Sequence, residues 1–275
     1  MATTKGKNRR PSEEAKASAL ARWSAWLDAR RTLMLIVIAA LTLLYSLLLF
    51  NARISEGGDD STYIQAGHDF IAKYPTYFFS FNAPGYPLFL SLPIHFFGVN
   101  VVLLKALSVL FYLLGALLLF RAFVGRVPAM LLLPVMLIMA VNSYAQYYAS
   151  QTYNEAFYFM LQGFFFLSFF RLIDRLETSS ELRSTWSVWL TLGLSMLLCT
   201  LVKNVAVMIV PAVVLFFLIN KQWKASLFTI GAFAAVKVPF EAIKYAVWGA
   251  VGQYSAQGDI LKLKDPYDRS LGYED

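Results

Sequence analysis

The chain has 275 residues, of which 58% are hydrophobic and only 15% are charged. This composition is more apolar than that of soluble globular domains and indicates an integral membrane protein. The net charge of +7 does not indicate nucleic-acid binding, because the basic residues lie in the N-terminal segment and in short loops between apolar runs. A single cysteine, Cys199, excludes a disulfide within the chain and a zinc site built on cysteines.

Residues 1–31 form a basic N-terminal segment with eight Lys or Arg residues and three acidic residues. The positive-inside rule predicts that such a segment is a cytoplasmic tail. Residues 33–50 follow without a charge and are long enough to cross a bilayer, which takes about 17 to 25 helical residues. We interpret them as the first transmembrane helix. A cleaved signal peptide is the alternative, but LLLFNARISEGG offers only a weak cleavage site.

Six further apolar runs predict a total of about seven transmembrane helices. They cover residues 100–120, 127–144, 156–170, 186–202, 205–220 and 225–240. Basic residues fall in alternate loops between these runs, which the positive-inside rule assigns to the cytoplasm. These residues are Arg121 and Arg126, then Arg171, Arg175 and Arg183, then Lys221 and Lys224. We therefore expect an all-α polytopic membrane protein whose transmembrane module covers residues 32–245.

This order requires residues 51–99 to form one large external loop. The apolar stretch 86–97 inside it is too short to cross a membrane and contains Pro87 and Pro93. We interpret it as an interfacial helix, and STYIQAGHDFIAKY as another short helix of the same loop. The four acidic residues of the loop outnumber its two basic residues, as a translocated segment tolerates well.

Several polar residues are then predicted to lie on the external side of the membrane. They are Asp59, Asp60 and His68 in the first loop, Glu155 at the end of the polar segment 146–155, Lys203 and Asn204 in the third loop, and Lys237 further on. Two acidic sites from different loops, at Asp59 and at Glu155, have the chemistry either to hold a divalent metal ion or to orient an attacking hydroxyl. The sequence does not choose between these roles.

Each of these residues also has a structural interpretation. Glu155 suits the first turn of a helix, where a carboxylate stabilises the helix dipole. Asp59 and Asp60 suit an N-cap of the helix that follows them. Lys203 and Lys237 have the charge to bind a phosphate, but lysines near helix ends also extend to lipid headgroups, an interpretation that applies to Lys105 as well. His68 and His95 lack a second histidine at ligand spacing, which argues against a zinc site.

Four stretches taken in order resemble the GT-C membrane glycosyltransferases, in particular the branch with the protein mannosyltransferases and the aminoarabinose transferase of lipid A. They are GGDDSTYIQAG, NAPGYPLFLSL, SQTYNEAFYFML and LVKNVAVMIVPAVVLFFL, and the resemblance covers residues 30–245. An early aspartate in that family's first external loop matches Asp59 or Asp60, and the tyrosine and alanine that follow it match Tyr63 and Ala66. The proline-rich stretch matches residues 83–87, and a second acidic residue matches Glu155.

The resemblance implies a polyprenyl-phosphate or diphosphate sugar donor and a glycan, lipid or protein acceptor on the external face. It makes Asp59 the candidate base, with Asp60 and Glu155 as further catalytic candidates, in a transfer that inverts the anomeric carbon. Tyr63, His68, Lys203, Asn204 and Lys237 become the candidate substrate-binding residues, and Asp59 and Glu155 the candidate ligands of a divalent metal ion. We expect no nucleic-acid partner and a bacterial inner-membrane location.

Two features depart from that family's pattern. Many relatives have Asp-Glu where this chain has Asp59-Asp60, so the functional aspartate is open. Family members also commonly continue beyond this length, and residues 246–275 resemble the start of a further external loop, which suggests the N-terminal part of a longer protein. The alternatives are a transporter or flippase of lipid-linked substrates and a non-catalytic relative. The observation that separates them is whether Asp59 and Glu155 approach each other.

Overall fold

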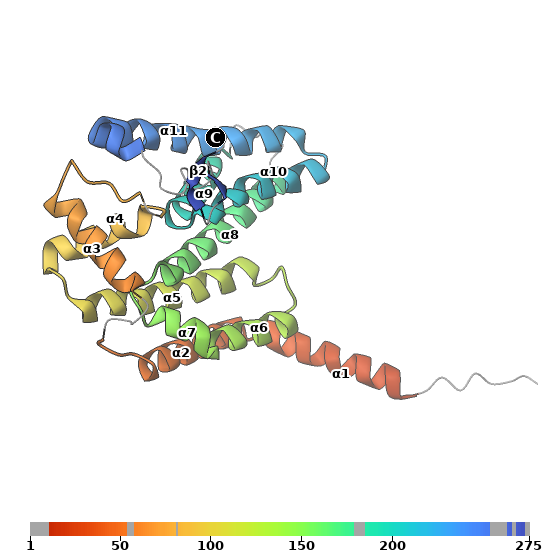
Figure 1. Ribbon diagram of the computed structural model, residues 1–275. Helices are drawn as coiled ribbons and strands as arrows, with labels where there is room; N and C mark the ends of the chain where they lie inside the picture. Colours follow the sequence, from red (N-terminus) through yellow and green to blue (C-terminus); the bar gives the residue numbers. More distant parts are fainter. Residues whose placement is uncertain are drawn as a thin grey trace, which may run out of the picture.

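A computed structural model describes residues 11–53, 58–80, 82–178, 185–253, 263–265 and 268–272. Within these ranges the chain is almost entirely helical (Figure 1). The elements are α1 Pro11–Asp28, α2 Arg31–Leu48, α3 Asp59–Ala72, α4 Gly85–Phe97, α5 Val101–Phe123, α6 Ala129–Val141, α7 Ser143–Ala149, α8 Asn154–Thr178, α9 Trp186–Val202, the 3-10 helix η2 Asn204–Met208, α10 Ile209–Ile219, α11 Trp223–Gln253, β1 Leu263–Asp265 and β2 Asp268–Gly272. The two strands pair as an antiparallel hairpin. Residues 1–10, Glu56 and Arg183 lie outside the described part.

Four helices are long and apolar enough to cross a membrane, namely α2, α5, α8 and α11. A fifth candidate is the pair α6 and α7, which is bent by 58°. Helix α9, with 17 residues, and the segment Asn204–Ile219 are shorter apolar helices. The predicted integral membrane protein is thus supported with four or five candidate spans in the described part of the chain, and the count of seven stays a prediction.

Large apolar side chains cover the outer surface of these helices. Leu131 and Ile138 on α6 and Ile219 on α10 are all more than 60% exposed. Such a surface is unfavourable in water and suits contact with lipid, since the backbone polar groups are bonded within the helices. The arrangement explains why these segments are apolar on every face.

Small residues allow the helices to approach closely in the interior. A Cβ atom at Gly115 of α5 would lie 2.4 Å from the Phe159 ring of α8. One at Gly193 of α9 would lie 2.3 Å from the carbonyl oxygen of Ala232 of α11. These contacts hold α5 against α8 and α9 against α11, around a core that includes the fully buried Trp189.

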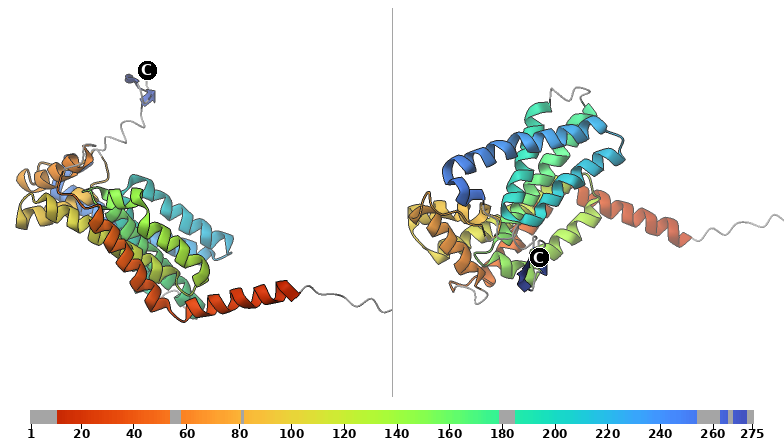
Figure 2. Two further views of the ribbon diagram at one scale, coloured as in Figure 1. Left: turned by 90° about the horizontal axis from the view of Figure 1, so that it is seen from below. Right: turned by 45° about the horizontal axis from the view of Figure 1, so that its top comes forward.

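The helices place the loops at two opposite ends of the molecule. Helices α3 and α4 lie at one end, and α1, the α5–α6 turn and the α10–α11 turn lie at the other (Figures 1 and 2). The basic Arg126, Lys221 and Lys224 are thus at the α1 end, and the acidic α3 is at the opposite end. This separation matches the predicted alternation of loops. The orientation in the membrane stays a prediction of the positive-inside rule.

The predicted short helices of the first loop are confirmed as α3 and α4. Helix α4 has 13 residues and contains Pro93, and its C-cap is Gly98, whose φ of 68° a residue with a Cβ adopts with difficulty. It packs against α3, where a Cβ at Gly67 would lie 3.1 Å from Leu90. Helices α3 and α4 therefore form a separate layer at one end of the longer helices (Figure 1).

Two helices extend beyond the predicted apolar runs. Helix α8 continues to Thr178 because charged residues such as Arg171 and Arg175 are good helix formers although they cannot lie in lipid. Helix α11 continues to Gln253, so the predicted boundary at residue 245 falls inside it. The apolar runs thus predicted where the helices lie. They did not predict where α8 and α11 end, because the last turns of both helices contain polar residues.

Candidate functional site

The candidate site begins with an ion pair between two helix ends. Glu155 lies in the first turn of α8, and Lys203 lies directly after α9, in an extended conformation before η2. Lys203 Nζ is 2.6 Å from Glu155 Oε1, with the two side chains 29% and 40% exposed. Each charge is also favourable for its own helix end, the carboxylate at an N-terminus and the ammonium at a C-terminus.

A hydrogen-bond relay connects this pair to α3. The side-chain amide of Asn154 donates to the Tyr63 hydroxyl at 2.9 Å and to the Val202 carbonyl at 3.1 Å. Tyr63 is buried, and burial raises its pKa, with further contributions from the charges of Glu155 and then Asp59. The phenol is therefore neutral. Asp59 lies one turn before Tyr63 on α3, so the Asn154–Tyr63 bond joins the starts of α3 and α8, which carry Asp59 and Glu155.

The two adjacent aspartates have different environments. Asp59 is exposed, whereas Asp60 is fully buried. Both are in the first turn of α3, whose N-cap is Gly58 with a φ of 79° and no side-chain capping bond. The N-cap interpretation of the aspartates is thus wrong, because only glycine readily adopts this backbone conformation at the cap. Asp60 instead acts electrostatically on Lys105 and Tyr86.

Lys105 of α5 is fully buried and joins three segments of the chain. Its ammonium donates to Asn51 Oδ1 at 3.1 Å, to the Arg53 carbonyl, and to Gln151 Oε1 at 2.7 Å. The expectation that this lysine extends to lipid headgroups is wrong, since protein oxygens from residues 46 to 54 positions away surround it. It ties the first loop to α5 and to the turn before α8, which positions Glu155.

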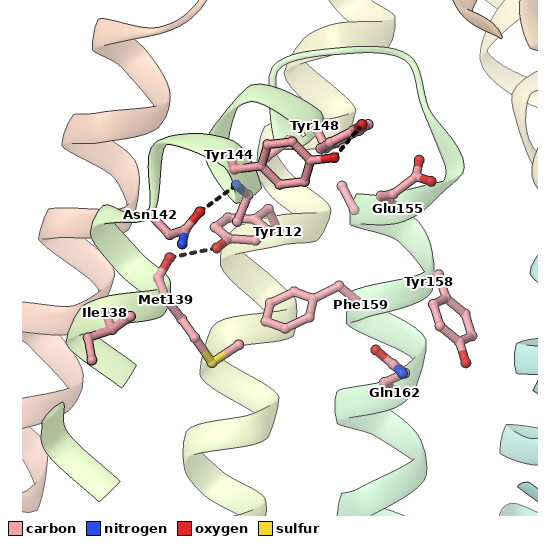
Figure 3. Close-up of a pocket in the computed structure, with 13 residues that line it drawn as sticks. Tyr112, Ile138, Met139, Asn142, Tyr144, Tyr148, Glu155, Tyr158, Phe159 and Gln162 are labelled. Carbon is pink, nitrogen blue, oxygen red and sulfur yellow. Dashed lines mark hydrogen bonds between the residues drawn. The ribbon is translucent and has the colours of Figure 1, made fainter. Parts of the chain in front are cut away.

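An apolar cavity of about 440 Å³ opens beside Glu155. It lies between α5, the α6–α7 bend and α8, with Glu155 and the Tyr144–Tyr148 pair at one end and Ile138, Met139 and Phe159 at the other (Figure 3). The two tyrosine hydroxyls are 3.0 Å apart. A charged group at the end of an apolar cavity suits a ligand with a polar head and a hydrocarbon chain.

The remaining predicted residues lie elsewhere. Asn204 and Lys237 line a separate, more polar cavity beyond the Lys203 backbone. His68 is exposed, with its ring nitrogen 3.6 Å from Asp69. Asp69 also accepts from Gln65 at 2.9 Å and from Lys73 at 2.8 Å. The predicted group is therefore divided into the Glu155 site, the Lys237 cavity and the Asp69 cluster.

The described residues include no group of three or more His, Cys, Asp or Glu with metal-binding geometry. Hard divalent cations take six or more oxygen ligands, and one oxygen of Glu155 is already bound by Lys203. The donor set at Asp59 and Glu155 thus fits a metal ion poorly, and metal binding there stays a prediction.

Several residues that build the site were not predicted from the sequence to lie in it. The polar run SQTYNE is the one sequence feature that pointed to Asn154 and Gln151 as candidates. For Lys105 the feature was a charge within an apolar helix. Their partners are distant in the sequence, so the pairing was not readable from spacing. Comparison with protein-family models, with curated proteins and with solved structures found no match to this chain.

Proposed function

We propose that this protein is a membrane glycosyltransferase that moves a sugar from a polyprenyl-phosphate donor to an acceptor at the α3–α4 end. The observation that carries the proposal is that Glu155, paired with Lys203, lines an apolar cavity, while its neighbour Asn154 bonds Tyr63, one turn after Asp59 on α3. A lipid-linked sugar phosphate combines the same elements, namely a hydrocarbon chain, a negative charge and a polar sugar. The external face is the proposed location of this end, following the positive-inside rule.

In this proposal Asp59 is the general base and Asp60 is a positioning residue. Asp59 is exposed, so an acceptor hydroxyl can reach it, whereas Asp60 is fully buried near Lys105. The acceptor oxygen loses its proton to Asp59 and forms a bond to the anomeric carbon. The bond from that carbon to the phosphate oxygen breaks, and the phosphate leaves with the electron pair, inverting the configuration.

Lys203 and Glu155 are proposed to act on the leaving phosphate. The ammonium of Lys203 can donate to phosphate oxygens, and Glu155 holds it at the mouth of the cavity. Asn154 and the neutral Tyr63 fix the distance between α3 and α8, on which the approach of base and phosphate depends. We derive no step through a metal ion, because the donor set fits one poorly.

The test is sugar release from polyprenyl-phosphate donors by the protein in nanodiscs, with and without a divalent metal ion. The proposal predicts release by the wild type that Asp59→Asn and Glu155→Gln abolish while the variants still fold and insert. Donor movement between leaflets without release would favour the transporter alternative. Release that both variants retain would show that these carboxylates are not the catalytic groups.

A further inference from the structure

A second cavity, of about 240 Å³, lies beyond the Lys203–Asn204 segment. Four parts of the chain line it: residues 78–80, 82 and 84 before α4, the end of α9, the start of η2 and one face of α11. Among the described residues, three charged groups lie on its wall, whereas Glu155 is the one charged residue that lines the first cavity. They are Lys237, Glu241 and Lys244, and all three belong to α11.

Both lysines share the Glu241 carboxylate. Lys237 Nζ is 2.5 Å from Glu241 Oε1, and Lys244 Nζ is 2.6 Å from Glu241 Oε2. Each ammonium has three protons to donate. One proton of each lysine goes to its own oxygen of Glu241, so both ammonium groups keep donors for a ligand. Two cations on one anion leave a net positive charge on the cavity wall. The Glu241 carboxylate therefore positions the two lysine ammonium groups next to each other, and its single negative charge balances only one of their two positive charges.

The position of these donors is fixed by aromatic contacts. Lys244 Nζ lies 5.7 Å from the centre of the Phe78 ring, and Lys237 Nζ lies 5.6 Å from that of Phe240. Trp248 packs against Phe78 with 5.1 Å between ring centres. The contacts of Lys244 and Trp248 with Phe78 hold α11 against the segment 78–80 on one side of the cavity.

The backbone at Gly249 completes the enclosure. Its φ of 56° is a conformation that a residue with a Cβ adopts with difficulty, and it turns the end of α11. Gly252 beyond the turn then lines the cavity. Lysine–glutamate pairs one turn apart are common on exposed helices, where they contribute little. Here they face a cavity that tertiary contacts enclose, with Lys244 only 15% exposed.

We propose that this cavity binds a phosphate group through Lys237 and Lys244, with Glu241 as the residue that positions both. Phosphate oxygens accept charge-assisted hydrogen bonds from ammonium groups, and a net positive wall favours an anion. The phosphate can belong to a lipid or be free in solution. The inference concerns a site separate from the Glu155–Lys203 pair and does not depend on sugar transfer.

The test measures binding by calorimetry to the full chain in a maltoside detergent, which contains no phosphate. The probes are inorganic phosphate, farnesyl phosphate and the uncharged farnesol. We expect Lys244→Met to lower phosphate affinity about tenfold or more, since it removes a charged donor. Lys237→Met, at a more exposed position, provides a second variant. Lys224→Met, at the exposed start of α11 at the opposite end, is the matched control and should bind as the wild type does.

Glu241→Gln separates a binding site from a structural ion-pair cluster. Removing the carboxylate frees both ammonium groups for the ligand, so the proposal predicts tighter phosphate binding by this variant. Binding of both phosphates would indicate a site for the group itself, and binding of farnesyl phosphate alone a site for a lipid phosphate. Equal affinity of the wild type and both lysine variants, or weaker binding by Glu241→Gln, would overturn the proposal. No sugar-phosphate donor is present, so failure here is distinguishable from failure of the proposed transfer.

Discussion

The ammonium of Lys203 lies 2.6 Å from Glu155 Oε1, although the two residues are 48 positions apart in the sequence. This pair joins the first turn of α8 to the end of α9. The Asn154 amide beside it reaches both Tyr63 and the Val202 carbonyl, so three helix ends meet at one point. The Asn154–Tyr63 bond therefore joins the start of α8, which carries Glu155, to α3 one turn after Asp59.

The close approach of α9 and α11 predicts opposite effects of two glycine substitutions. Gly193→Ala should destabilise the protein by about 1–3 kcal/mol, because the new methyl would overlap the Ala232 backbone. Gly231→Ala, with nothing within 4 Å of the new atom, should be neutral or stabilise α11 by up to about 1 kcal/mol. Cys199 is the single cysteine and is fully buried, so its labelling by a thiol reagent on heating reports unfolding. Equal melting temperatures of the two variants would contradict this account of the packing.

The buried Lys105 predicts a structural role. Lys105→Met removes a cation that donates to Asn51, Arg53 and Gln151, and we expect it to destabilise the protein by about 3–5 kcal/mol. The exposed Lys224→Met is the control and should change stability by about 0.5 kcal/mol or less. Labelling of Cys199 on heating compares the two. A Lys105→Met protein as stable as the wild type would show that the buried lysine is not a structural link.

How far the sequence predicts this structure depends on the range of the interactions. The length of 86–97 and its prolines correctly predicted a short helix, because they are local properties. The apolar runs located the long helices for the same reason. The contacts of Lys105 with Arg53 and Gln151 depend on the packing of distant segments, which no spacing reveals. The extension of α11 through Glu241 and Lys244 was missed because charged residues hid the helical pattern.

The neighbouring aspartates predict a clear division of effects. Asp60→Asn should destabilise the protein by about 1–3 kcal/mol, since it alters a fully buried carboxylate in the first turn of α3. Asp59→Asn should change stability by about 0.5 kcal/mol or less, because Asp59 is exposed, and should abolish sugar release. Thermal labelling of Cys199 and the nanodisc release assay measure the two effects. Full release by Asp59→Asn would exclude it as the base.

The Asp69 cluster predicts a pH dependence of stability. Burial raises the pKa of Asp69, but hydrogen bonds from Lys73 and Gln65 outweigh it and hold the pKa below its usual value. A lowered pKa in the folded state stabilises the protein above the unfolded-state pKa of about 3.9, and this stability is lost as the pH falls through the folded value. Asp69→Asn should therefore melt at a lower temperature than the wild type at pH 7. The difference should shrink as the pH falls below about 3.9 and disappear once Asp69 is protonated in the folded state, as followed by tryptophan fluorescence. A difference independent of pH would exclude the charge of Asp69 as its cause.

The most direct test of the Glu155–Lys203 site exchanges its two charges. Glu155→Lys combined with Lys203→Glu keeps an ion pair at this position, and the partly exposed pair contributes only about 1 kcal/mol or less to stability. The exchange moves the ammonium away from its place at the end of α9. The account predicts that the double variant folds as the wild type does, as measured by protection of the buried Cys199 from a thiol reagent. It also predicts that the variant no longer releases sugar from the polyprenyl-phosphate donor. Release at the wild-type rate by the exchanged pair would contradict it, because the pair would then serve only to hold α8 against α9.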